Sequence, residues 1–295
     1  MYYLYSHRDT ASTGETESVE TSVESTPYEG EVSKTAGTKS IQQEPTPGKT
    51  QVAVKDGPAV QRIKNGSQRP PNALQYKLDE GIAIVQGDIA LGEIVDAEEG
   101  ATTGFVKMPE IRLWESSIIP IYIQPNLQNP ERVIKALEYF NGTAIRFIPY
   151  TDQEDVMVFE ESGGICKSYV GKIGGKQPLW IAPNCGPDDI AHEIMHALGF
   201  VHEQNRTDRD QYITLFPENI DEQYQDNFFR LPESLMTVSG LAAFDYNSLM
   251  MYPPTMFSKN GQPTMQSRRS DKDINPTEGL SSGDIDRLHK AYGGR

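Results

Sequence analysis

The sequence predicts an α+β protein, and three patterns along its 295 residues indicate this class. Residues 118–123 form a run of β-branched and apolar side chains, which is typical of a buried strand. Residues 129–142 open with Asn-Pro-Glu, carry apolar side chains at helical spacing and close with Asn-Gly, so they predict an amphipathic helix. Residues 279–292 place a Ser-Ser-Gly-Asp cap before a second apolar stripe. We therefore expect a sheet together with a few helices.

Composition and charge limit the class of partner. The net charge is -15, yet residues 1–70 carry 8 basic and 9 acidic side chains, so nearly all of the acidic excess lies in residues 71–295. An acidic surface argues against nucleic acid and against anionic membranes. No run approaches the roughly 18 apolar residues of a membrane span. We expect neither nucleic acid nor a membrane as a partner.

The first part of the chain predicts little folded structure. Residues 10 to about 71 are rich in Ser, Thr, Glu, Gly, Pro and Gln with isolated apolar side chains, and such a segment cannot offset its ordering entropy. We interpret residues 1–71 as a disordered low-complexity leader, with an interaction tail as the functional alternative. Extended pieces at 75–78 and 82–85 follow, and residues 93–104 are acidic and dotted with glycine, as suits an exposed segment.

The pattern with the most chemical content is His192-Glu193-x-x-His196, followed by Gly199 and His202. Histidines four apart share one face of a helix. Gly199 can end the helix in the left-handed conformation, so the turn can bring His202 to the same ion. Three neutral imidazoles leave a fourth position for water, which is typical of catalytic zinc. A chance match on a charged helix is the alternative, but three of the five histidines fall within eleven residues.

The extended pattern H-E-x-x-H-x-x-G-x-x-H resembles the metzincins, and the residues that follow it resemble the astacin family. The residues that carry this resemblance are Glu203, Arg206, Asp208, Arg209, Asp210 and Tyr212, with further landmarks at Trp114, 118–120, 145–147 and 166–171. The resemblance implies a metzincin-like, two-lobed catalytic domain at residues 105–295. Its N-terminal lobe would hold a twisted mixed sheet and the zinc helix, and its C-terminal lobe would be largely irregular and end in a helix.

The resemblance also implies the chemistry, which is that of a zinc-dependent endopeptidase. One Zn²⁺ per chain would be held by His192, His196 and His202, and Glu193 would act as the general base. Tyr252 would donate a hydrogen bond to the oxyanion that develops during hydrolysis. The alternatives are a different metzincin branch and a non-enzymatic binding module.

Three further features of the family pattern have counterparts here. Residues 245–252 resemble the Met-turn, with Met250 as an apolar floor beneath the zinc histidines and Met251 where the family usually has histidine. Glu203 would anchor the mature N-terminus. Cys166 and Cys185 stand at positions that resemble one family disulfide, whereas two free thiols would suit a cytosolic protein.

Residues 72–104 resemble a pro-segment. Residues 85–88 resemble its F-x-G-D motif, with Val85 in place of phenylalanine, so Asp88 would occupy the open zinc position and keep a zymogen latent. A plain Gly-Asp turn is the alternative. By the family's spacing before Trp114, the mature chain would begin around residues 104–106.

The family acts on extended peptide and protein substrates, and this chain is expected to do the same as a monomer. Residues 179–182 are expected to be the edge strand that pairs with substrate, although an ordinary apolar strand would look the same. The family and the disulfide imply a secreted or extracellular protein. Residues 1–9 lack the basic start and apolar run of a signal peptide, so the route of export stays open.

Overall fold

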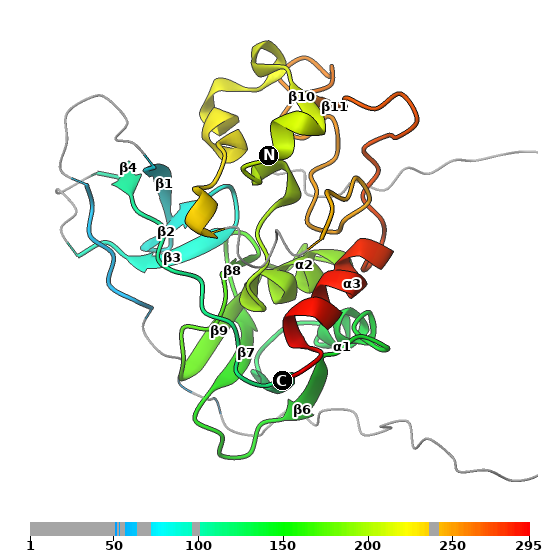
Figure 1. Cartoon of the computed structure of the whole chain (residues 1–295). Coiled ribbons are helices and arrows are strands. Elements are labelled where there is room, and N and C mark those ends of the chain that lie inside the picture. The colour runs from blue at the N-terminus through cyan, green and yellow to red at the C-terminus, as the bar shows by residue number, and fades with distance from the viewer. Residues whose placement is uncertain (1–50, 52, 54–56, 64–71, 96–100, 236–241) are drawn as a thin grey trace, which may run out of the picture. The chain divides into compact units, whose positions relative to one another are not determined.

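The computed structural model describes residues 51, 53, 57–63, 72–95, 101–235 and 242–295 (Figure 1). Most of the expected leader therefore lies outside the described residues. Its described part packs against the sheet, since the Val60 amide donates to the Glu93 carbonyl at 2.9 Å and the Ile63 amide to the Phe105 carbonyl at 2.8 Å. Val60 is buried in an apolar cluster. The sequence analysis predicted that folded structure begins at residue 72. Residues 60 and 63 already pack against the sheet, so folded structure begins earlier.

A mixed sheet of nine strands organises the described chain, in the order β4-β1-β2-β3-β8-β9-β7-β5-β6. Figure 1 shows β1 to β4 gathered on one side of β8 and β9. The parallel pairing of β3 with β8 joins the two groups. The strands are β1 Leu74–Asp79, β2 Ile82–Val85, β3 Ile89–Glu93, β4 Thr103–Val106, β5 Ile118–Ile123, β6 Arg146–Pro149, β7 Val156–Glu161, β8 Lys167–Tyr169 and β9 Lys176–Ile181.

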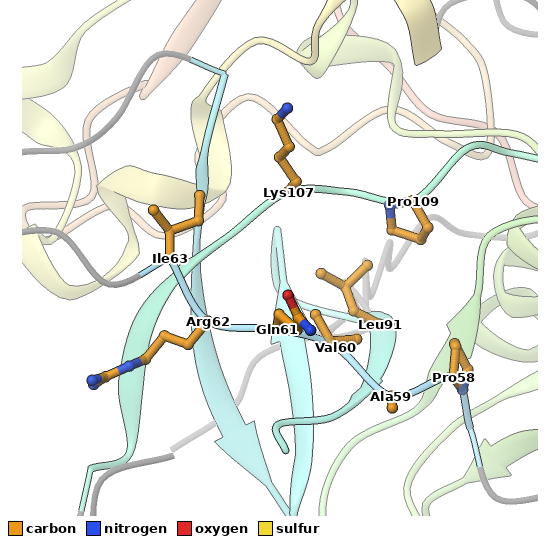
Figure 2. A pocket seen from close by; sticks show the side chains of 9 residues that line it. All are labelled: Pro58, Ala59, Val60, Gln61, Arg62, Ile63, Leu91, Lys107 and Pro109. Carbon is orange, nitrogen blue, oxygen red and sulfur yellow. The ribbon is translucent and has the colours of Figure 1, made fainter. Parts of the chain in front are cut away.

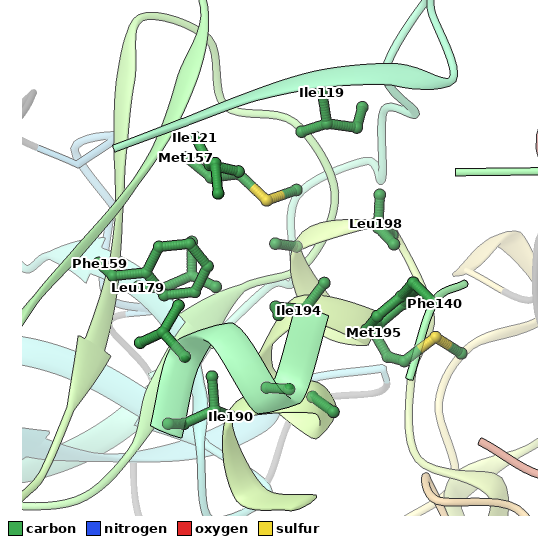
Figure 3. Packing of buried hydrophobic residues seen from close by; sticks show 14 of the residues in the cluster. Ile119, Ile121, Phe140, Met157, Phe159, Leu179, Ile190, Ile194, Met195 and Leu198 are labelled. Atoms are coloured by element: carbon green, nitrogen blue, oxygen red, sulfur yellow. The ribbon is translucent and has the colours of Figure 1, made fainter. Parts of the chain in front are cut away.

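The remaining five strands, β5 to β9, form a second group. The main core lies where two helices pack on these strands. α1 spans Glu131–Glu138, and α2, which carries the histidine pattern, spans Pro187–Ala197. α2 lies against α1, β8 and β9. Figure 3 shows apolar side chains of α2, including Ile190 and Ile194, facing those of the strands. This burial stabilises α2, because a packed apolar face contributes most of a short helix's stability.

The chain after α2 is largely irregular, as expected for the C-terminal lobe. Short 3-10 helices lie between Glu203 and Leu235, and β10 Ile213–Leu215 pairs with β11 Met265–Ser267. α3 spans Ser282–Tyr292, and its N-cap Ser281 accepts a hydrogen bond from the Asp284 amide at 3.0 Å. The α+β class and the two-lobed arrangement are confirmed. None of the described helices has the length and apolarity that a membrane crossing requires.

Cys166 and Cys185 are joined by a disulfide. The bond ties the residue before β8 to the residue that precedes the α2 N-cap. The bridge implied by the sequence is therefore present.

The expectation that residues 179–182 form the edge strand is wrong. Most of this stretch belongs to β9, which lies between β7 and β8. The three-residue strand β8 covers β9, because Lys167 and Ser168 pair with Trp180 and Leu179. Among β5 to β9, the strand at the end next to β3 is β8, and β3 pairs with its outer edge.

Candidate metal centre

α2 begins and ends where its sequence predicts. The Asp189 carboxylate accepts a hydrogen bond from the amide of the N-cap Gly186 at 2.8 Å. At the other end Gly199 has φ +98°, and its amide donates to the His196 carbonyl at 2.7 Å. The Trp114 indole and the Tyr292 hydroxyl cap the carbonyls of Ala197 and Leu198. The turn after the helix is therefore held by side chains from both ends of the domain.

We expect Gly199→Ala to destabilise the protein. The left-handed backbone costs a residue with Cβ about 1–2 kcal/mol, and the new Cβ would lie 2.5 Å from Leu113 Cδ2. Gly142→Ala is the matched control, because Gly142 has φ +84° with open space around its Cβ position. Urea midpoints should therefore fall for both variants and fall further for Gly199→Ala. A smaller loss at Gly199 than at Gly142 would contradict this account.

Four side chains converge at the end of α2. Asp88 carboxylate oxygens lie 3.6 Å from His192 Nε2, 3.4 Å from His196 Nε2 and 3.3 Å from His202 Nε2. One ligand atom from each residue lies within 4.8 Å of the others. His196, His202 and Asp88 are buried, with exposed fractions of 0%, 0% and 5%. The three histidines and the aspartate chosen from the sequence thus form one group.

Hydrogen bonds orient two of the imidazoles. His192 Nδ1 lies 3.0 Å from the Leu249 carbonyl oxygen, and His196 Nδ1 lies 2.8 Å from the Phe200 carbonyl oxygen. A proton on each Nδ1 leaves Nε2 with its lone pair. Burial lowers the pKa of His196 to about 4, so this ring is neutral near pH 7. Neutral imidazole is the form that binds a metal.

The donor set fits a zinc ion. His196 Nε2 and Asp88 Oδ1 are buried without a hydrogen-bond partner. His192 Nε2 and His202 Nε2 face each other at 3.0 Å. Buried polar atoms without partners are costly, and a cation between them would satisfy them together. Three imidazole nitrogens and one carboxylate oxygen match the ligand types that zinc prefers.

Glu193 lies beside this group without joining it. Its side chain is buried, and Oε2 has no hydrogen-bond partner. Burial raises the pKa of the Glu193 carboxyl well above its usual value, and the charges of Asp88 and Asp189 raise it further. A carboxyl group with a raised pKa next to a metal site suits proton transfer near neutral pH.

The turn expected to be the Met-turn contacts His192 through the Leu249 carbonyl. Met250 is buried in the main core, and its carbonyl accepts from the Glu203 amide at 2.8 Å. Ser248 Oγ donates to Asp284 at 2.6 Å, and the Leu249 amide donates to the same carboxylate at 2.8 Å. The turn that orients His192 is therefore fixed to the start of α3.

Tyr252 lies next to the metal group. Its ring centroid is 4.8 Å from that of His202, and its hydroxyl donates to the Gln86 carbonyl at 2.5 Å. Gly87, with φ +103°, permits this approach, because a Cβ there would lie 3.0 Å from the Tyr252 hydroxyl. No pattern in the sequence indicated the contact between Tyr252 and Gln86.

Glu203 is buried in an ion-pair network. Its Oε1 accepts from Arg287 at 2.7 Å, from Arg206 at 3.1 Å and from the Asp245 amide at 2.7 Å. Burial raises the pKa of the Glu203 carboxyl, although both arginines oppose this shift. Residues 104–106, the expected start of the mature chain, lie in β4 and pair with β1. The carboxylate expected to hold the mature N-terminus is thus already bound by arginine.

A pocket of about 370 Å³ is lined by residues outside the metal group, and Figure 2 shows their side chains. None of the side chains chosen from the sequence lines it. The lining residues are Pro58, Ala59, Val60, Gln61, Arg62, Ile63, Leu91, Lys107 and Pro109. It lies between the described part of the leader and the chain after β4, so it does not contribute to the metal group.

The α+β fold and three histidines around a turn define a metzincin-type zinc peptidase, and comparison with known proteins identifies the family. The family model for Astacin, a peptidase family, matches residues 106–293. The chain therefore belongs to the astacin family, and residues 106–293 form the domain that this peptidase family shares.

Individual relatives agree with the family. Zinc metalloproteinase nas-13 of Caenorhabditis elegans is 36% identical over 185 residues, which is 61% of this chain and 40% of that protein. Tolloid-like protein 2 of Mus musculus is 36% identical over 191 residues, 61% of this chain and 19% of that protein. The chain thus spans less than half the length of these relatives. The solved structure of High choriolytic enzyme 1, a hatching enzyme zinc-protease of Oryzias latipes, matches with a TM-score of 0.55, 31% identity, and coverage of 63% of this chain and 100% of that chain.

Proposed function

We propose that this protein is a latent zinc endopeptidase in which Asp88 occupies the open zinc position. The observation that carries the proposal is the contact of one pro-segment carboxylate with all three imidazoles, at 3.3–3.6 Å. Burial opposes ionisation of the Asp88 carboxyl, but the closeness of His202, His192 and His196 outweighs it and holds the pKa of this carboxyl well below its usual value. An ionised carboxylate is the form that binds a metal.

Bound zinc would supply a Lewis acid and lower the pKa of a water from about 15.7 to roughly 7. Glu193 would accept the proton of the attacking water and return it to the departing amine, since it is the carboxyl group beside the ligands. The Tyr252 hydroxyl would donate to the developing oxyanion once the Gln86 carbonyl leaves it. Met250 would serve as the apolar floor of the site.

Extended peptides and proteins are the substrates that this arrangement fits. β3 pairs with β8 through Ile89 and Ser168, beside Asp88. Release of residues 72–104 would free the edge of β8 for an extended substrate, which is β-strand addition. Secretion and a monomeric state are parts of the same proposal, and the Cys166–Cys185 disulfide supports an oxidising compartment.

Activation would require cleavage within residues 100–108, which divides a pro-segment at 72–104 from a catalytic domain at 105–295. Residues 103–106 form β4, so this strand must first separate from β1 to enter a protease. The new N-terminus would then approach Glu203. Its ammonium group would have to share Oε1 with Arg206 and Arg287 or replace one of them.

Metal content and chelator sensitivity test the proposed activity. The chain cleaved between residues 100 and 108 should hold close to one zinc per chain and hydrolyse casein, and a chelator should abolish hydrolysis until zinc is restored. The uncleaved chain should bind zinc equally and hydrolyse casein at least about tenfold more slowly, because the tethered carboxylate competes at an effective concentration near millimolar. Cleaved protein that contains zinc but leaves casein intact would refute the proposed activity.

A further inference from the structure

Arg287 is a buried cation on α3 whose guanidinium group contacts two buried carboxylates. Its Nη2 donates to Glu203 Oε1 at 2.7 Å and to the Ala243 carbonyl oxygen at 2.8 Å, and its Nη1 lies 3.4 Å from Asp284 Oδ1. The exposed fractions of Arg287, Glu203 and Asp284 are 2%, 1% and 0%. Arg206 also pairs with Glu203, but among the described cations Arg287 alone pairs with both carboxylates.

The first of these carboxylates supports His202. Glu203 directly follows His202 in the chain, and its amide donates to the Met250 carbonyl oxygen at 2.8 Å. Its side chain accepts a hydrogen bond from the Asp245 amide at 2.7 Å. The backbone and the side chain of Glu203 therefore fix the turn that carries His202 to residues 245–250. Arg287 holds the same carboxylate from α3.

The second carboxylate supports His192. Asp284 accepts hydrogen bonds from Ser248 Oγ at 2.6 Å and from the Leu249 amide at 2.8 Å. The Leu249 carbonyl oxygen lies 3.0 Å from His192 Nδ1. The orientation of this imidazole thus depends on where Asp284 holds residues 248 and 249. One guanidinium group therefore contacts the supports of two imidazoles that come from different elements.

We propose that Arg287 is a positioning residue of the metal site, and that it sets the separation of His192 from His202. It does so by binding Asp284 and Glu203 with one planar group, whose N–H donors lie at fixed angles and suit two carboxylates at once. Without Arg287, two buried carboxylates would lie close together without the cation between them, which is costly. The supports of the two imidazoles should then separate. This inference rests on the proposed zinc site but not on the peptidase activity.

The zinc affinity of the full, uncleaved chain tests the inference without any peptide hydrolysis. Competition with a chelator should show that Arg287→Met raises the Kd for zinc by about 10–100-fold, the range typical of groups that orient metal ligands. Arg287→Lys should raise the Kd less, because an ammonium group keeps the charge but not the geometry. Lys290→Met is the matched control. It removes an exposed cation from the same helix and should leave the Kd within about twofold.

A double variant separates the effect of charge from the effect of packing. Glu203→Gln removes one of the charges that Arg287 neutralises. Arg287→Met should therefore weaken zinc binding less in the Glu203→Gln protein than in the wild type, by at least about threefold. A role in packing alone would give the same factor in both proteins. The visible spectrum of the Co²⁺-loaded chain, which depends on ligand geometry, should change in Arg287→Met and stay unchanged in Lys290→Met.

The possible outcomes separate this inference from the earlier proposals. An unchanged zinc Kd in Arg287→Met, or an equal loss in the wild-type and Glu203→Gln proteins, would overturn it. If Arg287→Met did not fold, the Kd of Arg287→Lys would decide, and a value equal to that of the wild type would overturn the inference. Unchanged zinc binding in His196→Ala would instead refute the zinc site itself. A cleaved chain that needs Arg287 for zinc but leaves casein intact would refute the peptidase proposal alone.

Discussion

Replacing Glu193 with alanine is expected to lower kcat/KM for peptide hydrolysis by about 10²–10⁴-fold while zinc content stays close to one per chain. The side chain is not among the four that converge, so its loss leaves the ligands in place. It is also buried with one oxygen unpartnered, so its removal should not lower the thermal midpoint. Metal analysis, kinetics and thermal unfolding of the activated chain measure the three quantities.

Two other variants make this result specific. His196→Ala should lose both zinc and hydrolysis, because Nε2 of that ring is one of the converging donors. His289→Ala should lose neither, since that histidine is exposed on α3. If Glu193→Ala retained hydrolysis within about tenfold of wild type, the general base would have to be another group.

Replacing Asp88 with alanine is expected to raise the peptidase activity of the uncleaved chain at least about tenfold. The variant removes the carboxylate from the imidazoles but keeps the pairing of β3 with β8. An extended substrate must still displace that strand, so activity should remain below that of the cleaved chain. Kinetics on protein shown by mass spectrometry to be uncleaved measures the gain.

Glu93→Ala is the matched control for Asp88→Ala. Glu93 is an exposed carboxylate on β3, the strand that begins immediately after Asp88. Its removal changes the charge of the pro-segment by the same amount without touching the imidazoles. Equal activities for the Asp88 variant and the wild-type uncleaved chain would mean that residues 72–104 inhibit through strand pairing alone.

The sequence by itself determined the features that depend on residues close to one another along the chain. The strand at 118–123, the cap of α3 at Ser281 and the end of α2 before Gly199 lie where their patterns predict. The grouping of the zinc histidines follows as well, because helical spacing and one glycine turn bring them together. These features depend on backbone conformation and side-chain periodicity within about ten residues.

Only the tertiary structure decided which distant groups meet. The edge strand was misplaced because an apolar stretch such as β9 looks the same at the edge of a sheet and inside it. Tyr252 meets a carbonyl 166 residues away, and Lys167 meets a carboxylate 87 residues away. No local pattern encodes such pairs, since they depend on the order of strands in the sheet. The joining of β3 to β8 therefore determines what covers the metal site and what neutralises the buried lysine.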